Sequence, residues 1–279
     1  MSFRSVRNSS AALSERQLAI VELVRVQGYQ TIESLAERFS VTQQTIRRDV
    51  NQLCEARILR RLHGGAELLA GTENLPYEAR QVAQREAKQQ IAEIVRELVP
   101  NRASLFFGIG TTPELVAIAL ADHEDLTVVT NNLNVAMALS RNPSNRVVIA
   151  GGKLRLPDRD VLGEGVGSLF ASFKVDYGIY GVGGIDEDGS LLDFDLAEVQ
   201  AREAIAANCR TRILVADYSK FGRNATVRGG SVADVHHFVC ERMPPATIVE
   251  LLDRRGVALH LPTELGSMQP EGSDRPGLG

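Results

Sequence analysis

Residues 31–51 read TIESLAERFSVTQQTIRRDVN and contain two short helical patterns separated by a tight turn. Thr31 and Thr42 each precede a run of helix-favouring residues, and threonine is a common residue at the N-cap of a helix. The first run breaks at Ser40, and the second carries its own apolar stripe. This order predicts a helix-turn-helix at about residues 30–49.

The second predicted helix has one buried and one exposed face. Ile46, Val50 and Leu53 recur at i, i+4 and i+7, so they share one stripe and must be buried. Polar and basic side chains therefore face outward. Arg binds guanine in a bidentate manner, Asn and Gln bind adenine, and the first backbone N–H groups of a helix suit a phosphate. The predicted DNA contacts on this helix are Thr42, Gln43, Gln44, Thr45, Arg47, Arg48 and Asn51.

A further helix and a hairpin flank this motif. Ser14 and Gln17 form a capping-box pattern ahead of an apolar-periodic run, and two short strand patterns surround Gly64 and Gly65. The sequence thus predicts a winged helix-turn-helix over residues 13–69, although each pattern alone also fits a purely structural helical domain. Basic side chains of the hairpin would reach the DNA backbone or the minor groove. They are Arg60, Arg61 and His63.

Charge is distributed unevenly along the chain. The 279 residues carry a formal net charge of −4. Residues 1–72 contain 10 Lys and Arg against 7 Asp and Glu, a net of +3, which leaves −7 for the rest. We therefore expect the affinity for DNA to belong to the N-terminal third.

The composition also bears on compartment and cofactors. The sequence has no long apolar run, and its first residues lack the apolar region of a signal peptide. Three scattered cysteines, Cys54, Cys209 and Cys240, fit neither a disulfide framework nor a metal site. We expect a cytoplasmic protein with no membrane segment, no metal and no cofactor.

A second domain with a different pattern follows. After a helix of about residues 81–98, short apolar runs alternate with helical patterns, which predicts an α/β domain with a mostly parallel sheet. We expect this larger domain over residues 83–261, a linker over residues 70–82, and a disordered tail over residues 262–279. The predicted strands contain residues 105–107, 126–129, 147–150, 178–182, 213–216 and 238–240.

The end of the first of these strands resembles a phosphate cradle. In open parallel sheets a ligand lies beyond the carboxyl ends of the strands, and here Gly110, Thr111 and Thr112 follow the first strand. We expect Thr112 to be the N-cap and Pro113 the first residue of the next helix. Backbone amides, hydroxyls and a helix N-terminus together favour phosphate, although the stretch alone also fits an ordinary strand-to-helix turn.

The other strand ends add amides, cations and carboxylates. Cations and amides hold a phosphate, and carboxylates accept hydrogen bonds from hydroxyls, so the set suits a phosphorylated polyol or sugar. For Asp193, and for the nearby Asp195, stabilisation of a helix N-terminus is an equal alternative. The predicted effector-binding residues are Gly110, Thr111, Thr112, Asn131, Asn132, Gly152, Lys153, Arg155, Asp193 and Lys220.

Several of these motifs resemble those of the DeoR family of bacterial repressors, over about residues 13–261. The resemblance implies a sensor domain related in fold to ribose-5-phosphate isomerase that binds a sugar phosphate, with no enzymatic activity. The acid pair that an isomerase needs for proton transfer is not complete here. The motifs are QTIRRD at residues 44–49, HGGA at 63–66, GTT at 110–112, VTNN at 129–132, GGID at 183–186 and SKFG at 219–222.

Within the family, four further stretches are similar to members that control glycerol and glycerol phosphate metabolism. The resemblance implies a repressor released from operator DNA by sn-glycerol 3-phosphate. Because DNA half-sites repeat along the duplex, we also expect a homo-oligomer, a dimer or a tetramer. Two alternatives stay open: a repressor of the same family that senses another sugar phosphate, and a sugar-phosphate isomerase fused to a DNA-binding domain. The stretches are residues 110–114, 131–136, 188–192 and 221–225.

Two positions depart from the family pattern. Gly108 stands where related repressors commonly carry Asp, and Asp193 stands where the glycerol phosphate type carries Glu. Neither change removes a predicted phosphate contact, so both bear on the polyol part of the effector.

Overall fold

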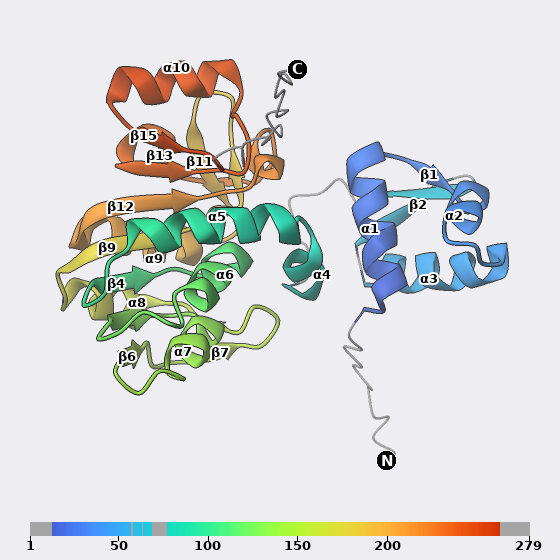
Figure 1. Cartoon of the computed structure of the whole chain (residues 1–279). Coiled ribbons are helices and arrows are strands. Elements are labelled where there is room, and N and C mark those ends of the chain that lie inside the picture. Colours follow the sequence, from blue (N-terminus) through green and yellow to red (C-terminus); the bar gives the residue numbers. More distant parts are fainter. Residues whose placement is uncertain (1–12, 57, 63, 69–76, 263–279) are drawn as a thin grey trace, which may run out of the picture.

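The computed structural model describes residues 13–56, 58–62, 64–68 and 77–262. Figure 1 shows a small N-terminal part and a larger α/β part. None of the helices in the described residues is long and apolar enough to cross a membrane.

The N-terminal part is a winged helix-turn-helix. Its helices begin after the predicted caps: Ser14 and Gln17 form a complete capping box, and the Thr31 and Thr42 side chains accept hydrogen bonds from Ser34 N and Thr45 N. The three strands form an antiparallel sheet in the order β1-β3-β2. The elements are α1 (Glu15–Gln27), β1 (Gln30–Thr31), α2 (Ile32–Arg38), α3 (Gln43–Glu55), β2 (Leu59–Leu62) and β3 (Gly65–Leu68).

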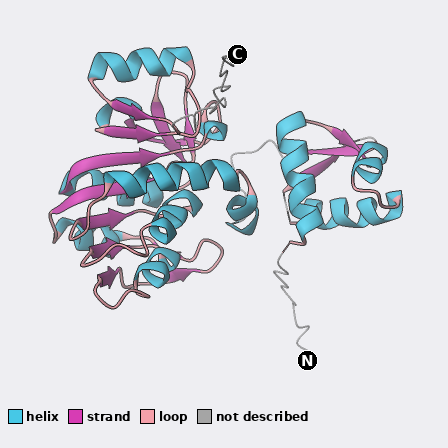
Figure 2. Ribbon diagram, in the orientation of Figure 1, coloured by secondary structure: helices cyan, strands magenta, loops and turns pink. Residues whose placement is uncertain are grey.

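The larger part contains a seven-stranded sheet in the order β15-β14-β12-β9-β4-β5-β6, and each pair of neighbours is parallel. Figure 2 shows these strands lying between layers of helices. All six predicted strands are present, with ends shifted by up to four residues. The strands of this sheet are β4 (Ser104–Phe107), β5 (Thr127–Thr130), β6 (Arg146–Ile149), β9 (Val175–Tyr180), β12 (Cys209–Val215), β14 (His237–Val239) and β15 (Ala258–His260).

Alternation along the strands produces two cores, one on each face of the sheet. In β4, Phe106 packs with Phe170 on one face, while Leu105 and Phe107 pack with Ile91 on the other. Helices α5, α6 and α7 cover the second face, and α8, α9 and α10 cover the first. These helices are α5 (Arg85–Leu98), α6 (Thr111–Ala119), α7 (Leu133–Leu139), α8 (Glu164–Ala171), α9 (Leu196–Asn208) and α10 (Ala246–Arg255).

Two small sheets and two short turns of helix were not predicted. They lie beside the carboxyl edge of the main sheet, where β10, β11 and β13 pair antiparallel and β7 pairs with β8. Their short strands carry no long apolar pattern. They are β7 (Leu154–Arg155), β8 (Asp160–Val161), β10 (Gly184–Ile185), β11 (Ser190–Asp193), β13 (Val227–Ser231), η1 (Tyr218–Lys220) and η2 (Val232–Asp234).

One predicted helix is in fact two. The prediction of a single helix over residues 81–98 is wrong, because α4 (Tyr77–Val82) ends before Gln84, whose φ of 55° is left-handed, and α5 begins at Arg85. The last part of the predicted linker over residues 70–82 is therefore helical. The rest of that linker and residues 263–279 of the predicted tail lie outside the described residues.

Candidate functional site

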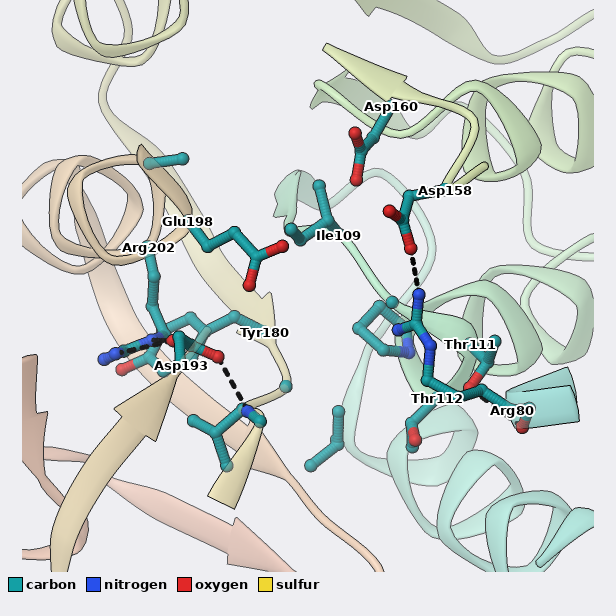
Figure 3. Close-up of a pocket in the computed structure, with 18 of the residues that line it drawn as sticks. Arg80, Ile109, Thr111, Thr112, Asp158, Asp160, Tyr180, Asp193, Glu198 and Arg202 are labelled. Atoms are coloured by element: carbon teal, nitrogen blue, oxygen red, sulfur yellow. Dashed lines mark hydrogen bonds and ion pairs between the residues drawn. The ribbon is translucent and has the colours of Figure 1, made fainter. Parts of the chain in front are cut away.

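A pocket opens at the carboxyl ends of β4, β9 and β12, where the predicted ligand site was expected. Its walls also include α4, the β7–β8 hairpin and α9, so residues from both ends of the larger domain meet there. Figure 3 shows Arg80, Thr111 and Thr112 on one side of this pocket and Asp193, Glu198 and Arg202 on the other.

The N-terminus of α6 forms one wall. Gly110 has a φ of 113° and is the N-cap, so the helix begins at Thr111 and Pro113 is its third residue. The prediction of Thr112 as N-cap is wrong, because the left-handed φ of Gly110 starts the helix two residues earlier. The first N–H groups of a helix lack intrahelical acceptors and carry its positive dipole end, so this wall favours an anion.

Ion pairs occupy much of the pocket. Arg80 pairs with Asp158, as Figure 3 shows. Arg155 forms a two-pronged contact with Asp160, at 2.8 Å for both hydrogen bonds, and a further 2.8 Å bond with Glu198. Burial raises the pKa of both Asp160 and Glu198, although Arg155 opposes this by stabilising their charged forms. The positive charge of Arg155 is therefore already balanced by the carboxylates of Asp160 and Glu198.

A second ion pair lies deeper. Arg202 donates to Asp193 Oδ2 from Nε at 3.1 Å and from Nη2 at 2.9 Å, and both side chains are buried. Gly183 N donates to Asp193 Oδ1 at 2.7 Å. Burial raises the pKa of Asp193, opposed chiefly by the arginine. Both carboxylate oxygens thus have partners within the protein.

Lys220 differs from these arginines. Its ammonium forms no ion pair or hydrogen bond with any residue that the structure describes, although it lines the pocket. Burial, together with the nearby Arg223, lowers the pKa of Lys220 to about 7. Burial opposes ionisation of the neighbouring Asp217, but Lys220 and Lys88 hold its pKa below the ordinary value. Lys220 is therefore a cation that lacks a counter-ion in direct contact.

Asn131 provides an acceptor in the same pocket. The side chain is fully buried, and Nδ2 donates to Val161 O at 2.9 Å. Its Oδ1 has no hydrogen-bond partner among the described residues. A buried acceptor without a partner costs free energy, so this atom favours a ligand that brings a donor.

The second candidate surface is the exposed face of α3. Ile46, Val50 and Leu53 are fully buried, as predicted, and Arg47, Arg48 and Asn51 are exposed. Asp49 is also buried, and it forms an ion pair with Arg16 on α1, in which Arg16 Nε lies 2.6 Å from Asp49 Oδ2. This pair fixes the helix against α1. The groove on the exposed face is lined by Gln44, Arg47, Arg48, Asn51, Gln52, Glu55 and Arg61.

Neighbouring side chains pre-order part of this face. Arg61 Nη1 on the wing donates to Asn51 Oδ1 at 2.7 Å, and Arg47 Nη2 donates to Gln43 Oε1 at 3.3 Å. Arg60 is paired with Glu67 across the hairpin, so its charge is partly compensated. The remaining predicted wing contact, His63, lies outside the described residues.

Comparison with known proteins identifies both parts. Residues 16–72 match the DeoR-like helix-turn-helix domain, and residues 83–242 match the DeoR C terminal sensor domain. The chain belongs to the DeoR family. This DeoR-family protein is thus a DNA-binding transcription regulator, as its resemblance implied.

Several relatives of this DeoR-family protein are named repressors. The glycerol-3-phosphate regulon repressor of Escherichia coli (strain K12) is 46% identical over 89% of this chain and 98% of its own length. That of Haemophilus influenzae is 45% identical over 87% and 94%. Among solved structures, ribose 5 phosphate isomerase A from Neisseria gonorrhoeae superimposes at a TM-score of 0.37 and 18% identity, covering 50% of this chain and 54% of that chain.

The pocket brings together most of the predicted effector residues, but not all. Asn132 lies outside the lining, because its Oδ1 caps α7 by accepting from Asn134 N and Val135 N. Gly152 and Lys153 are exposed and also lie outside it. Asp195 is the N-cap of α9, so it stabilises a helix N-terminus, which was the alternative to ligand binding. The predicted residues that line the pocket are Gly110, Thr111, Thr112, Asn131, Arg155, Asp193 and Lys220.

Several residues that line the pocket are not indicated by any sequence pattern. Tyr77 and Arg80 fall within the predicted linker over residues 70–82, and Asp158 and Asp160 lie in a stretch without periodicity. A detectable signal existed only for Arg202, which lies four residues after Glu198 on the apolar stripe of α9.

Proposed function

We propose that this DeoR-family protein binds operator DNA through α3 and its wing and is released when sn-glycerol 3-phosphate enters the pocket. The observation that carries the proposal is the meeting of the α6 N-terminus with Lys220 in one pocket of a protein that also carries a DNA-reading helix. The names of its glycerol-3-phosphate regulon relatives support this effector. A repressor of this kind acts in the cytoplasm.

The effector fits the polar groups of the pocket. A phosphate dianion gains from the free N–H groups of α6, the Thr111 and Thr112 hydroxyls, and the Lys220 ammonium. A glycerol hydroxyl can donate to Asn131 Oδ1, which otherwise lacks a partner. A small polyol suits this space because ion pairs of Arg155 and Arg202 already fill the opposite wall.

On the DNA, α3 lies in the major groove with Arg47, Arg48 and Asn51 toward the base edges. The N-terminus of α3, at Thr42 and Gln43, lies against the DNA backbone, with Gln44 and Thr45 beside it. Arg61 reaches the groove together with Asn51, to which it is bonded. The protein acts as a homo-oligomer, a dimer or a tetramer, so that two such helices reach successive half-sites.

Release follows if the effector binds the DNA-incompetent arrangement more tightly than the other. A preference of about 100-fold, roughly 2.7 kcal/mol, is enough for useful induction. No catalytic step is involved, so a pentose phosphate is bound or rejected but not converted.

A thermal-shift panel tests the effector. We expect sn-glycerol 3-phosphate to raise the unfolding temperature, and glycerol, ribose 5-phosphate and deoxyribose 5-phosphate to raise it less, because binding to the folded state alone stabilises it. The variants Thr111→Ala and Lys220→Ala should keep DNA binding and lose the response. A larger shift with a pentose phosphate would instead identify a repressor of the same family tuned to another metabolite.

A further inference from the structure

Helix α4 contacts both parts of the molecule. It spans only Tyr77–Val82, yet Tyr77 and Arg80 line the pocket while Ala79 is 2% exposed in the hydrophobic core of the DNA-binding part, together with Ile20 and Val24. Figure 1 shows α4 at the edge of the larger part that faces α1. One helix therefore has a ligand face and a face that packs on the DNA-binding domain.

On the ligand face, α4 is held by polar contacts. Arg80 pairs with Asp158, and the two side chains are 14% and 21% exposed. The Tyr77 hydroxyl donates to the Glu114 carboxylate. Lys88 of α5 donates to the carbonyl oxygen of Arg80, which also accepts from Thr111 Oγ1 at 3.4 Å. The position of α4 thus depends on groups that surround the expected phosphate site.

On the other face, the contacts are with α1. Gln84 Nε2 donates to Glu22 Oε1 at 3.0 Å, and Ala79 completes the apolar cluster. Gln84 is also the residue with a φ of 55° that separates α4 from α5. Such a conformation costs free energy for a residue with a side chain, and strained positions of this kind occur at switch regions. The junction is therefore a natural hinge.

We propose that Arg80 is a phosphate-binding residue of the effector site, and that its transfer from Asp158 to the effector phosphate shifts α4 and so moves the DNA-binding domain. This inference rests on the proposed function. A phosphate at the α6 N-terminus lies beside Arg80, because Thr111 at that N-terminus contacts the Arg80 carbonyl. A dianion is a stronger partner for a guanidinium than one carboxylate, and it repels Asp158.

The movement reaches DNA through packing. Since α4 is a single short helix, a shift of Arg80 on one face displaces Ala79 on the other, and close-packed side chains transmit such shifts. The DNA-binding domain then changes its position relative to the sensor domain without any change in its own core. In an oligomer, such a movement alters the spacing of the two α3 helices that must match two half-sites.

The first test uses Ala79→Asp, which places a charge in the apolar contact between α4 and α1 and replaces no residue that lines the pocket. Ala207→Asp, at an exposed position of α9, is the matched control. The DNA probe is a fragment selected by the wild-type protein from a random pool at fixed salt. We expect A79D to bind sn-glycerol 3-phosphate within about twofold of wild type and to lose the effect of this ligand on DNA affinity.

The second test concerns Arg80 itself. Arg80→Gln should weaken sn-glycerol 3-phosphate binding about tenfold or more, because a charge-assisted contact is lost, while Arg85→Gln, at an exposed position of α5, should not. Hydrogen exchange of the α1 amides provides a measurement that needs no variant. In the wild-type protein, sn-glycerol 3-phosphate should change the exchange of α1 severalfold.

The outcomes separate this inference from the proposed function. A wild-type protein that does not bind sn-glycerol 3-phosphate overturns the proposed function itself. Two results overturn only the route through α4, provided that the wild-type protein binds sn-glycerol 3-phosphate and then leaves DNA. One is an A79D variant whose DNA affinity responds to the ligand as in wild type. The other is hydrogen exchange of α1 that the ligand does not change. Equal ligand affinity of R80Q and R85Q removes Arg80 from the site.

Discussion

The two polar surfaces of this protein are built in opposite ways. On α3, Arg47 and Arg48 are exposed at the surface, and Arg47 Nη2 donates a long 3.3 Å hydrogen bond to Gln43 Oε1. In the pocket, Arg155 and Arg202 are held by carboxylates that are themselves buried. A surface that meets a large polyanion needs no internal counter-ions, whereas a pocket that is emptied and filled must compensate its charges in both states.

This difference shows which cation is free to respond. Among the described cations of the pocket, Lys220 stands apart because its charge has no direct partner, and the pKa of about 7 reflects that environment. Arg155 and Arg202 shape the pocket wall, and under the proposals above Lys220 and Arg80 provide the affinity for a phosphate.

The largest effect is expected at the buried pair of Asp193 and Arg202. Arg202→Ala leaves the Asp193 charge buried without its partner, which typically costs about 3–5 kcal/mol of unfolding free energy. Urea unfolding of the full chain measures this. The exposed pair of Arg228 and Asp188 is the control, since solvent screens it and Arg228→Ala should leave the unfolding free energy nearly unchanged. Equal costs at the two sites would contradict the contrast between pocket and surface.

The next effect concerns DNA affinity. Arg48→Ala should weaken specific DNA binding by about 1–3 kcal/mol and leave stability nearly unchanged, because Arg48 is an exposed residue of α3. Gel shifts at fixed salt on selected and random DNA measure the specific and the non-specific affinity, and urea unfolding measures the stability. Arg254→Ala, on α10, should change neither the DNA affinity nor the stability. If Arg48→Ala has wild-type affinity for the selected sequence, this residue does not read the operator.

A pH dependence follows from Lys220. The free pocket loses the Lys220 proton as the pH rises through about 7, while the bound phosphate requires the charged form. Affinity for sn-glycerol 3-phosphate should therefore fall above pH 7, by up to about tenfold per pH unit. Calorimetry at pH 7 and pH 8.5 measures the change. Lys220→Met should bind weakly with no such fall, and the same slope in that variant would assign the titration to another group.

The smallest effect is expected at the cap of α3. Thr42→Ala removes the side-chain acceptor of Thr45 N and should cost about 1 kcal/mol of stability. Thermal unfolding measures the loss, and Thr42→Ser should restore most of it. A loss of DNA affinity in Thr42→Ser at normal stability would show that the methyl group, rather than the cap, contacts DNA.

Helical periodicity was sufficient to predict the exposed face of α3. Once Ile46, Val50 and Leu53 are placed against the core, the directions of the remaining side chains of that helix follow, because helical spacing is local. The same spacing places Asp49 within the stripe, so its burial could have been predicted, although not its pairing with Arg16. The caps at Thr31 and Thr42 were predictable for the same reason, since a cap depends on its own turn.

The pocket was only partly predictable. Glycines and threonines after β4 indicated a candidate anion site, but the partners of the cations come from distant parts of the chain. Arg80 and Asp158 are 78 residues apart, and Arg155 and Glu198 are 43 apart. No local pattern reports such pairs. The break at Gln84 was also invisible, because neither Gly nor Pro marks it and tertiary contacts hold its left-handed backbone.

The central claim is that the exposed face of α3 and the pocket act on one equilibrium. The most direct measurement is the affinity of the full-length protein for its selected DNA, at fixed salt, with and without saturating sn-glycerol 3-phosphate. We predict that the ligand weakens DNA binding by about 100-fold and that saturating DNA weakens ligand binding by the same factor. A DNA affinity that is unchanged by a ligand shown to bind would contradict the account.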